Sequence, residues 1–322
     1  ELANAESNHP QLVKSLLFKL KYKHVLEEDS WVRGTQILRE EIDGAHQPVQ
    51  AIYQSILGQW LYSYKRMHQW EISERRTLTT RSIDIREWSN RDFDDEIWQA
   101  YFTSIEDADT RQSSISDFSA IVEQGSRNGN LRDNVYQLLF HRMFDHFSRD
   151  PSIKITQSGL DVISSATQEF LSADVSVIVE ERTRDFVKLL QVEVSRLRSE
   201  GLNEAFVDLE LLRWKYALDN GADRAMIRSH MEELSRDISD SDVYPEVVHE
   251  IARNLLISST RESSNRVYVK SLLERTIEDY PDTYGADLCQ SLLTNDLLQS
   301  EIRFNVESVE LPNKAFRVLL SY

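Results

Sequence analysis

The chain has 322 residues, of which 40% are hydrophobic and 28% are charged, a balance typical of a globular rather than a disordered protein. A net charge of −17 argues against nucleic acid as a partner, because an acidic surface repels phosphate backbones. Only nine Gly and six Pro are present, which argues against a turn-rich all-β fold, and no apolar run approaches the ~20 residues of a membrane span.

The first part of the chain predicts a series of helices joined by short links. Residues 1–7 are interpreted as the end of a helix, and Pro10 is expected to begin the next one after a turn at Asn8, since proline is tolerated in the first helical turn. Apolar residues at helical spacing predict helices over 10–22, 30–44 and 48–64.

The stretch Met67–Trp88 is polar and lacks a helical stripe, so it is predicted to be an ordered loop with Trp70 and Trp88 as packing anchors. Helices are expected to resume after this loop, over 90–105, 116–123 and 131–147. Residues 148–179 form a second irregular stretch, in which 172–179 read as either a short strand or the start of a helix. The boundary between two helical halves is therefore expected there.

Regular helices are predicted beyond this stretch, over 180–198, 203–218, 223–238 and 244–257, with Gly201 and Gly221 at helix ends. Residues 264–293 then predict a helical hairpin. Pro281 ends its first helix near Tyr280, and Asp282 or Thr283 caps its second. This turn and a small residue on the second helix resemble a tetratricopeptide-type unit, which needs stacked neighbours to bury its apolar face.

The period of the apolar residues changes from helical to two near the end of the chain. Alternation at Phe304 and Val306, and again at Phe316, Val318 and Leu320, predicts two strands. The predicted fold is therefore all-α, with stacked antiparallel helix pairs in a tetratricopeptide-like superhelix and a short β segment at the C-terminus. The expected domains are an N-terminal helical array (1–147), an irregular connection (148–179), a C-terminal tetratricopeptide-like array (180–300) and the β segment (301–322).

Motifs for catalysis or metal binding are weak. His249 and Glu250 begin like a zinc-hydrolase helix, but position 253 is Arg rather than the second His. The acidic run Asp92–Glu96 is interpreted as a favourable charge at a helix N-terminus, and Cys289, the only cysteine, as a small buried hydrophobe. No residue is therefore assigned to catalysis, to a metal or to a cofactor.

Candidate contacts to a partner come from aromatic and basic side chains. Arginines in the polar loop, Arg75 and Arg76 among them, fit a partner's carboxylates, although pairing with the chain's own acidic residues is the default. Trp70, Trp88 and Trp214 are the tryptophans that could line a groove, although their number is also typical of a core.

Five segments in order resemble the N-terminal helical region of the very large alpha-2-macroglobulin-family proteins of Bacteroidota. The segments are NHPQLVKSLLFKLKY, LYSYKRMHQWEISERRT, DIREWSNRDFDDEIWQAYFTSI, DNVYQLLFHRMFDHF and IEDYPDTYGADLCQSL. The closing VESVELPNKAFRVLLSY looks like the opening of the first macroglobulin-type β-domain, which the resemblance implies is truncated here.

The resemblance implies an exported protein of the periplasm, outer membrane or cell surface, whose larger relatives trap or block proteases. The thioester pattern of some relatives is absent, because Cys289 is followed by Gln290-Ser291-Leu292. No trapping residue therefore carries over. The implied partners are downstream β-domains of the same protein, and other envelope proteins or proteases.

The leading functional hypothesis is a non-catalytic helical scaffold that holds a protein partner. The alternative is a binding module for an external peptide or glycan in a helical groove. A hydrolase that uses carboxylates of the region 67–88 is the least favoured, because no motif supports it.

Overall fold

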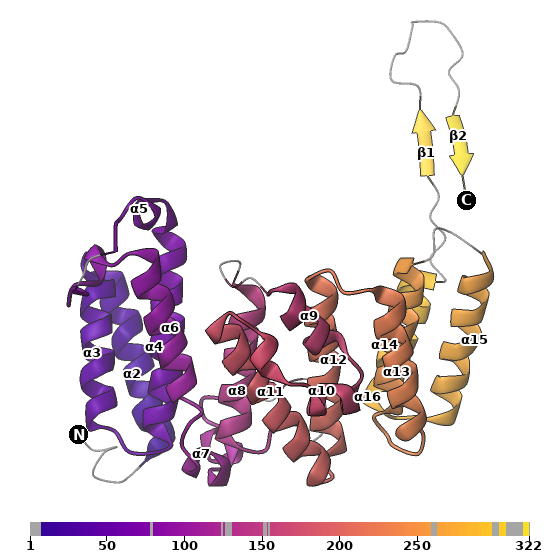
Figure 1. The fold of residues 1–322 in the computed structure, drawn as a ribbon, viewed down its shortest axis with the longest axis horizontal. Helices are drawn as coiled ribbons and strands as arrows, with labels where there is room; N and C mark the ends of the chain where they lie inside the picture. Colours follow the sequence, from indigo (N-terminus) through magenta and orange to yellow (C-terminus); the bar gives the residue numbers. More distant parts are fainter. Residues whose placement is uncertain are drawn as a thin grey trace, which may run out of the picture. The chain divides into compact units, whose positions relative to one another are not determined.

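A computed structural model describes residues 8–77, 80–123, 125, 131–150, 153, 155–258, 263–297, 303–306 and 318–321, and its fold is all-α with a short β hairpin (Figure 1). This confirms the predicted fold class. The chain divides into two compact units. The first comprises Glu1–Ile155 with Glu180–Thr183, and the second comprises Thr156–Val179 with Arg184–Tyr322.

Three long antiparallel helices and a fourth that packs on them form the body of the first unit. Its elements are α2 (His9–Leu26), α3 (Ser30–Gly44), α4 (Val49–Met67), α5 (Gln69–Ser73), η1 (Ile85–Glu87), α6 (Asn90–Thr103), α7 (Asp109–Gln112), η2 (Ile115–Phe118) and α8 (Val135–Arg149). Helix α4 packs against α2, α3, α6 and α8, so it is the central helix of this unit.

Local capping explains where the helices of the first unit begin. The Asn8 side chain accepts a hydrogen bond from the Gln11 N–H at the start of α2, which satisfies one of the free donors of the first turn. Ser89 and Asp92 form a reciprocal capping box at the start of α6. The acidic run thus begins with a residue that fixes a helix end.

Short elements occupy regions that the sequence predicts to be irregular. The loop expected over 67–88 contains α5 and η1, and the helix expected over 116–123 is the 3₁₀ turn η2. The connection expected over 148–179 contains α9 (Gln157–Ser164), α10 (Thr167–Ser172) and the 3₁₀ turn η3 (Val175–Val177). The expected strand or helix start at 172–179 is therefore the end of α10 followed by η3.

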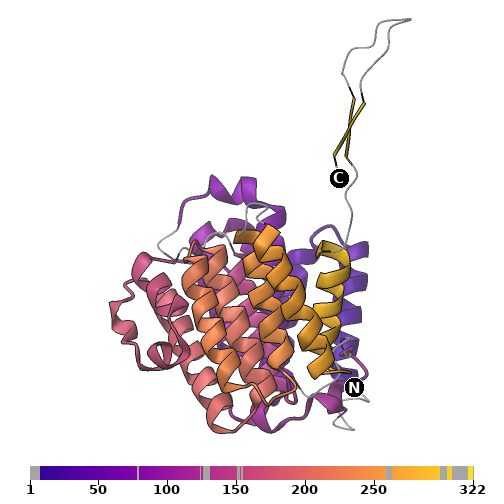
Figure 2. The ribbon, with the colours of Figure 1, turned by 90° about the vertical axis from the view of Figure 1, so that its right-hand side faces the viewer.

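The second unit continues with longer helices. They are α11 (Glu181–Ser199), α12 (Asn203–Asp219), α13 (Arg224–Asp237), α14 (Tyr244–Ser258), α15 (Ser263–Asp279) and α16 (Tyr284–Leu292), followed by the π-helical turn η4 (Leu293–Leu297). Helices α13 to α16 lie side by side (Figures 1 and 2). Gly201 and Gly221 have φ of 70° and 95°, the left-handed conformation predicted for helix ends.

The predicted hairpin over 264–293 is α15 and α16. Helix α15 ends at Asp279, before Tyr280-Pro281, and Thr283 caps α16 by accepting a hydrogen bond from the Ala286 N–H. The hairpin packs on α14, and Cys289 is fully buried among apolar side chains of α14, α15 and α16. This confirms that a neighbouring helix covers the apolar face of the hairpin.

Two strands follow the helices, as the alternation predicts. β1 (Arg303–Val306) and β2 (Val318–Ser321) pair antiparallel, with Arg303 opposite Ser321 and Val306 opposite Val318. The expected turn near Pro312 and the alternation at Phe316 lie outside the described residues.

Candidate functional site

The five predicted contact residues differ in exposure. Trp70 on α5 is 81% exposed, whereas Trp88 and Trp214 are at most 1% exposed. Arg76 is exposed. Arg75 is partly covered, donates to the backbone carbonyl of Trp88 and lies 3.6 Å from a Glu71 carboxylate oxygen. Only Trp70 and Arg76 therefore remain on the surface for a partner.

Trp88 is a core residue, which corrects its assignment to a groove and confirms its role as a packing anchor. Its Nε1–H donates to the Ser82 carbonyl at 2.7 Å, and its ring lies 5.1 Å from that of Phe93. The guanidinium groups of Arg39 and Arg81 lie 5.5 Å and 5.0 Å from the indole. Trp88 thus fixes the loop between α5 and α6, whereas the exposed Trp70 anchors nothing in this way.

The acidic run of α6 makes ion pairs with other elements. Its carboxylates pair as follows: Asp94 with Lys65, Asp95 with Arg91 and Arg182, and Glu96 with Arg39 and Arg81. The interpretation as a helix-end charge is therefore incomplete. These residues also hold α3, α4, the loop after α5 and the start of α11 to α6.

A polar pocket of about 880 Å³ lies in the first unit beside α4, α6 and α8. Lys65 and Asp94 form a largely buried ion pair on its wall. Burial raises the pKa of the Asp94 carboxyl, although the Lys65 hydrogen bond favours its charged form. His146 lies between two aromatic rings, with centroids 4.6 Å from Tyr62 and 4.8 Å from Tyr101.

The histidine of this pocket lies near a carboxylate. Burial lowers the pKa of His146 to about 4, against the opposing effect of Asp150, so the imidazole is neutral at neutral pH. Its Nε2 lies 3.7 Å from an Asp150 carboxylate oxygen. The residues that line the pocket include no serine, threonine or cysteine, but they include lysine, aspartate and tyrosine side chains, which also act as nucleophiles in some enzymes.

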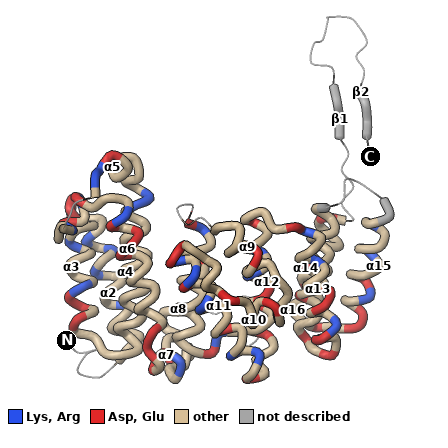
Figure 3. The backbone as a smooth tube through the Cα atoms, viewed as in Figure 1, with Lys and Arg blue, Asp and Glu red and all other residues tan. Residues whose placement is uncertain are grey.

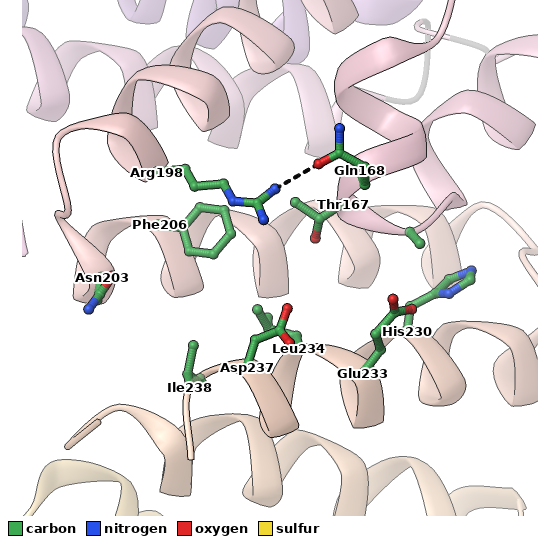
Figure 4. A pocket seen from close by; sticks show the side chains of 11 residues that line it. Thr167, Gln168, Arg198, Asn203, Phe206, His230, Glu233, Leu234, Asp237 and Ile238 are labelled. Atoms are coloured by element: carbon green, nitrogen blue, oxygen red, sulfur yellow. Dashed lines mark hydrogen bonds between the residues drawn. The ribbon is translucent and has the colours of Figure 1, made fainter. Parts of the chain in front are cut away.

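A second pocket, of about 370 Å³, lies in the second unit beside α10 to α13 (Figure 4). Arg198 donates to the Gln168 side-chain oxygen at 3.2 Å on one side. Glu233 and Asp237 of α13 lie on the other side (Figure 4). A cation and two carboxylates therefore face one cavity.

Trp214 lies in the core of the same unit, which corrects its assignment to a groove. Its indole N–H donates to the Ser165 carbonyl at 3.2 Å. The neighbouring Arg213 and Glu210 are both fully buried and paired, so this part of α12 holds the α9–α10 turn rather than a ligand.

The cysteine and the histidine motif have structural roles. Burial raises the pKa of the Cys289 thiol to about 12, so the thiol is protonated and a poor nucleophile or metal ligand. Glu250 of the incomplete zinc motif accepts hydrogen bonds from Arg253. Over the described ranges, no group of three or more His, Cys, Asp and Glu could hold a metal ion.

The outer face of α2 is the surface feature that sequence reasoning missed. Val13, Leu16 and Leu20 are buried on one side of this helix. Five apolar side chains are 42–79% exposed on the rest of it, namely Leu17, Phe18, Tyr22, Val25 and Leu26. The alternation of apolar and lysine residues in this helix was the available signal.

Lysine side chains flank these apolar residues. α2 contains four lysines and no acidic residue, in a chain of net charge −17. Lys19 pairs with Glu41 and Lys23 pairs with Glu27. Lys14 and Lys21 are exposed, and neither makes an ion pair with another described residue. Figure 3 shows the two signs of charge interspersed along the chain, whereas the charged residues of α2 are all basic.

Comparisons with models of known protein families, with curated proteins and with solved structures find no match to this chain. Of the helices that the structure describes, none has the length and apolar character needed to cross a bilayer.

Proposed function

We propose that the chain is a non-catalytic helical scaffold that binds a protein partner through the outer face of α2. One observation carries this proposal: α2 has apolar side chains on two opposite sides, and only one side is covered by α3 and α4. A helix that is apolar all round is normally buried, and contiguous exposed apolar side chains mark interaction surfaces.

The resemblance to macroglobulin-family proteins of Bacteroidota supports a wider proposal. In it, the scaffold belongs to an exported cell-envelope protein that acts as a protease inhibitor, and its partners are downstream β-domains, envelope proteins or proteases. The support is the order of five segments in the sequence, together with the paired strands β1 and β2 after the last helix.

Site-specific photo-crosslinking tests the contact surface. A photoreactive phenylalanine analogue replaces Tyr22 in the outer face, or Gln36 on α3 as an exposed polar control. Irradiation of the native host cells is expected to give a discrete protein adduct from position 22 and none from position 36. Equal labelling at both positions, or none at position 22, would contradict the proposal.

A binding module for a peptide or glycan is a second candidate, favoured by the opposed charges of the pocket in Figure 4. A zwitterionic peptide would place its carboxylate near Arg198 and its amine near Glu233 and Asp237. Calorimetric titration with short peptides tests this, and Arg198→Ala should abolish the heat of any such binding. A binding heat that is the same for the variant and the parent chain would show that the peptide binds outside this pocket.

A further inference from the structure

We infer that the occupant of the outer face of α2 is an amphipathic α-helix of another protein whose apolar stripe is flanked by acidic residues. This inference rests on the proposed function and adds the chemistry of the partner. It follows from three properties of the face, namely the spacing of its apolar side chains, its charge and its incompatibility with a second copy of the chain.

The spacing of the exposed residues favours a helix as the partner. Lys14, Phe18, Tyr22 and Leu26 form one row at four-residue intervals, and the rings of Phe18 and Tyr22 stack with centroids 6.1 Å apart. Leu17, Lys21 and Val25 form a parallel row. Two such rows are the ridges of a helix, and the groove between them accepts a ridge of another helix.

The length of the face sets the size of the partner. The exposed apolar residues run from Leu17 to Leu26, which is roughly 15 Å along the helix axis at 1.5 Å per residue. An occupant of about three turns therefore covers the stripe.

The charge of the face selects acidic flanks on that partner. Lys14 and Lys21 are exposed beside the apolar side chains and make no ion pair with the described residues. Complementary charge across an interface directs association and suppresses wrong partners. Lys14 and Lys21 are seven residues apart and lie on the same side of α2, so carboxylates along one edge of the partner's stripe would meet both ammonium groups.

The same lysines disfavour two other occupants. A symmetric dimer through α2 would place the lysines of both copies on one interface, because a two-fold axis brings the same patch together. An anionic membrane would attract α2 but would repel a chain of net charge −17 as a whole. A separate acidic helix avoids the first objection, and its few carboxylates present less negative charge to the chain than a continuous anionic surface does.

Two designed 18-residue peptides test the inference on the complete chain. They share one leucine stripe and differ only in their flanks, which are glutamate in one and lysine in the other. Fluorescence anisotropy is expected to show micromolar binding of the glutamate peptide and at least tenfold weaker binding of the lysine peptide. Equal affinity for the two peptides, or no binding of the glutamate peptide, would overturn the inference.

Two charge-reversed variants separate the local effect from net charge. The double variant Lys14→Glu/Lys21→Glu is expected to bind the glutamate peptide about tenfold more weakly than the parent chain does. It is expected to bind the lysine peptide more tightly. Lys188→Glu/Lys215→Glu changes the net charge equally at exposed positions of the second unit and should leave both affinities within about twofold. Equal loss in the two variants would show that only long-range charge acts.

A variant that removes apolar side chains from the outer face of α2 tests the contribution of the stripe, and a vesicle assay tests a lipid surface as the occupant. Phe18→Ser/Tyr22→Ser should abolish peptide binding with an unchanged circular dichroism spectrum, because both side chains are exposed. Co-flotation with vesicles containing phosphatidylglycerol, in the absence of peptide binding, would replace the helix by a lipid surface. If position 22 crosslinks in cells but neither peptide binds, the partner chemistry fails while the proposed scaffold function stands.

Discussion

The buried pair of Arg213 and Glu210 connects three short segments of the second unit. Both side chains are fully buried, and two guanidinium N–H groups reach the two carboxylate oxygens at 2.9 Å and 2.5 Å. Arg213 also donates to the backbone carbonyls of Ile163 and Ser165, and Thr167 donates to Glu210 at 2.6 Å. One ion pair thus holds the α9–α10 turn against α12.

Replacement of Arg213 by methionine should therefore destabilise the folded chain strongly. It leaves the Glu210 carboxylate buried without a cation and the Ile163 carbonyl without its Arg213 donor, which is expected to cost about 3–5 kcal/mol in the free energy of unfolding. Urea denaturation measures this cost. Arg275→Met, which removes an exposed ion pair to Asp279 on α15, should cost less than about 1 kcal/mol, and similar losses in both variants would refute this role for Arg213.

The roles of single residues were the least predictable part of the candidate site. Trp88 and Trp214 have the same side chain as Trp70, yet only Trp70 is exposed. Tryptophan serves cores and interfaces equally, so residue type alone does not distinguish them. The two backbone carbonyls that Arg213 binds lie 48 and 50 residues earlier in the chain, a separation that no local pattern reveals.

At the scale of the elements, apolar periodicity predicted the long helices well and the short ones poorly. Helices α11 to α15, of 14 to 19 residues, follow the predicted ranges closely, because about four turns repeat the apolar stripe several times. Helices α9 and α10 have eight and six residues, too few to show a period. For α9 the sequence contains one usable signal, the capping residue Thr156, whose hydroxyl accepts a hydrogen bond from the Gly159 N–H.

The close approach of α16 to α14 gives an element-scale prediction. A Cβ added at Gly285 would lie 2.6 Å from the backbone nitrogen of Glu246 and 2.7 Å from Cβ of Pro245. Backbone atoms cannot move aside cheaply, so Gly285→Ala should separate the helices and destabilise the chain by about 1–3 kcal/mol.

Gly44→Ala is the matched control, since a Cβ there meets no atom within 4 Å. It should leave the thermal midpoint unchanged or slightly raised, because alanine restricts the unfolded chain. A Gly285→Ala variant as stable as Gly44→Ala would show that the two helices have room for a side chain. The sequence predicted the turn and a small residue on the second helix, but not the neighbouring backbone that requires glycine.

At the scale of the whole molecule, two buried histidines set the response to acid. Burial lowers the pKa of His141 to about 3, and the Arg132 guanidinium acts in the same direction. Burial lowers the pKa of His146 to about 4, with Asp150 opposing and Lys65 adding to the shift. Both residues lie on α8 and both are neutral in the folded chain at neutral pH.

The sign of the effect follows from proton binding. In the unfolded chain both histidines regain a pKa near ~6.5, so between that value and the folded values the unfolded chain binds more protons. The stability is complete above pH ~6.5 and falls as the pH decreases, by roughly 2 kcal/mol for each histidine between pH 7 and 5. Hydrogen bonds from Ser176 lower the pKa of the exposed Asp174 carboxyl. Carboxylates of this kind titrate below this pH window.

Urea denaturation at pH 7, 6 and 5 measures this loss. His141→Gln and His146→Gln should each reduce the slope of stability against pH, whatever their effect on stability at pH 7. Burial also lowers the pKa of His230, which contributes to the slope that remains. The slope separates titration from packing, because a lost contact lowers the free energy of unfolding equally at every pH. A parent chain whose stability is constant from pH 7 to 5 would mean that these imidazoles accept protons without unfolding, and that the buried surroundings of α8 admit a charge.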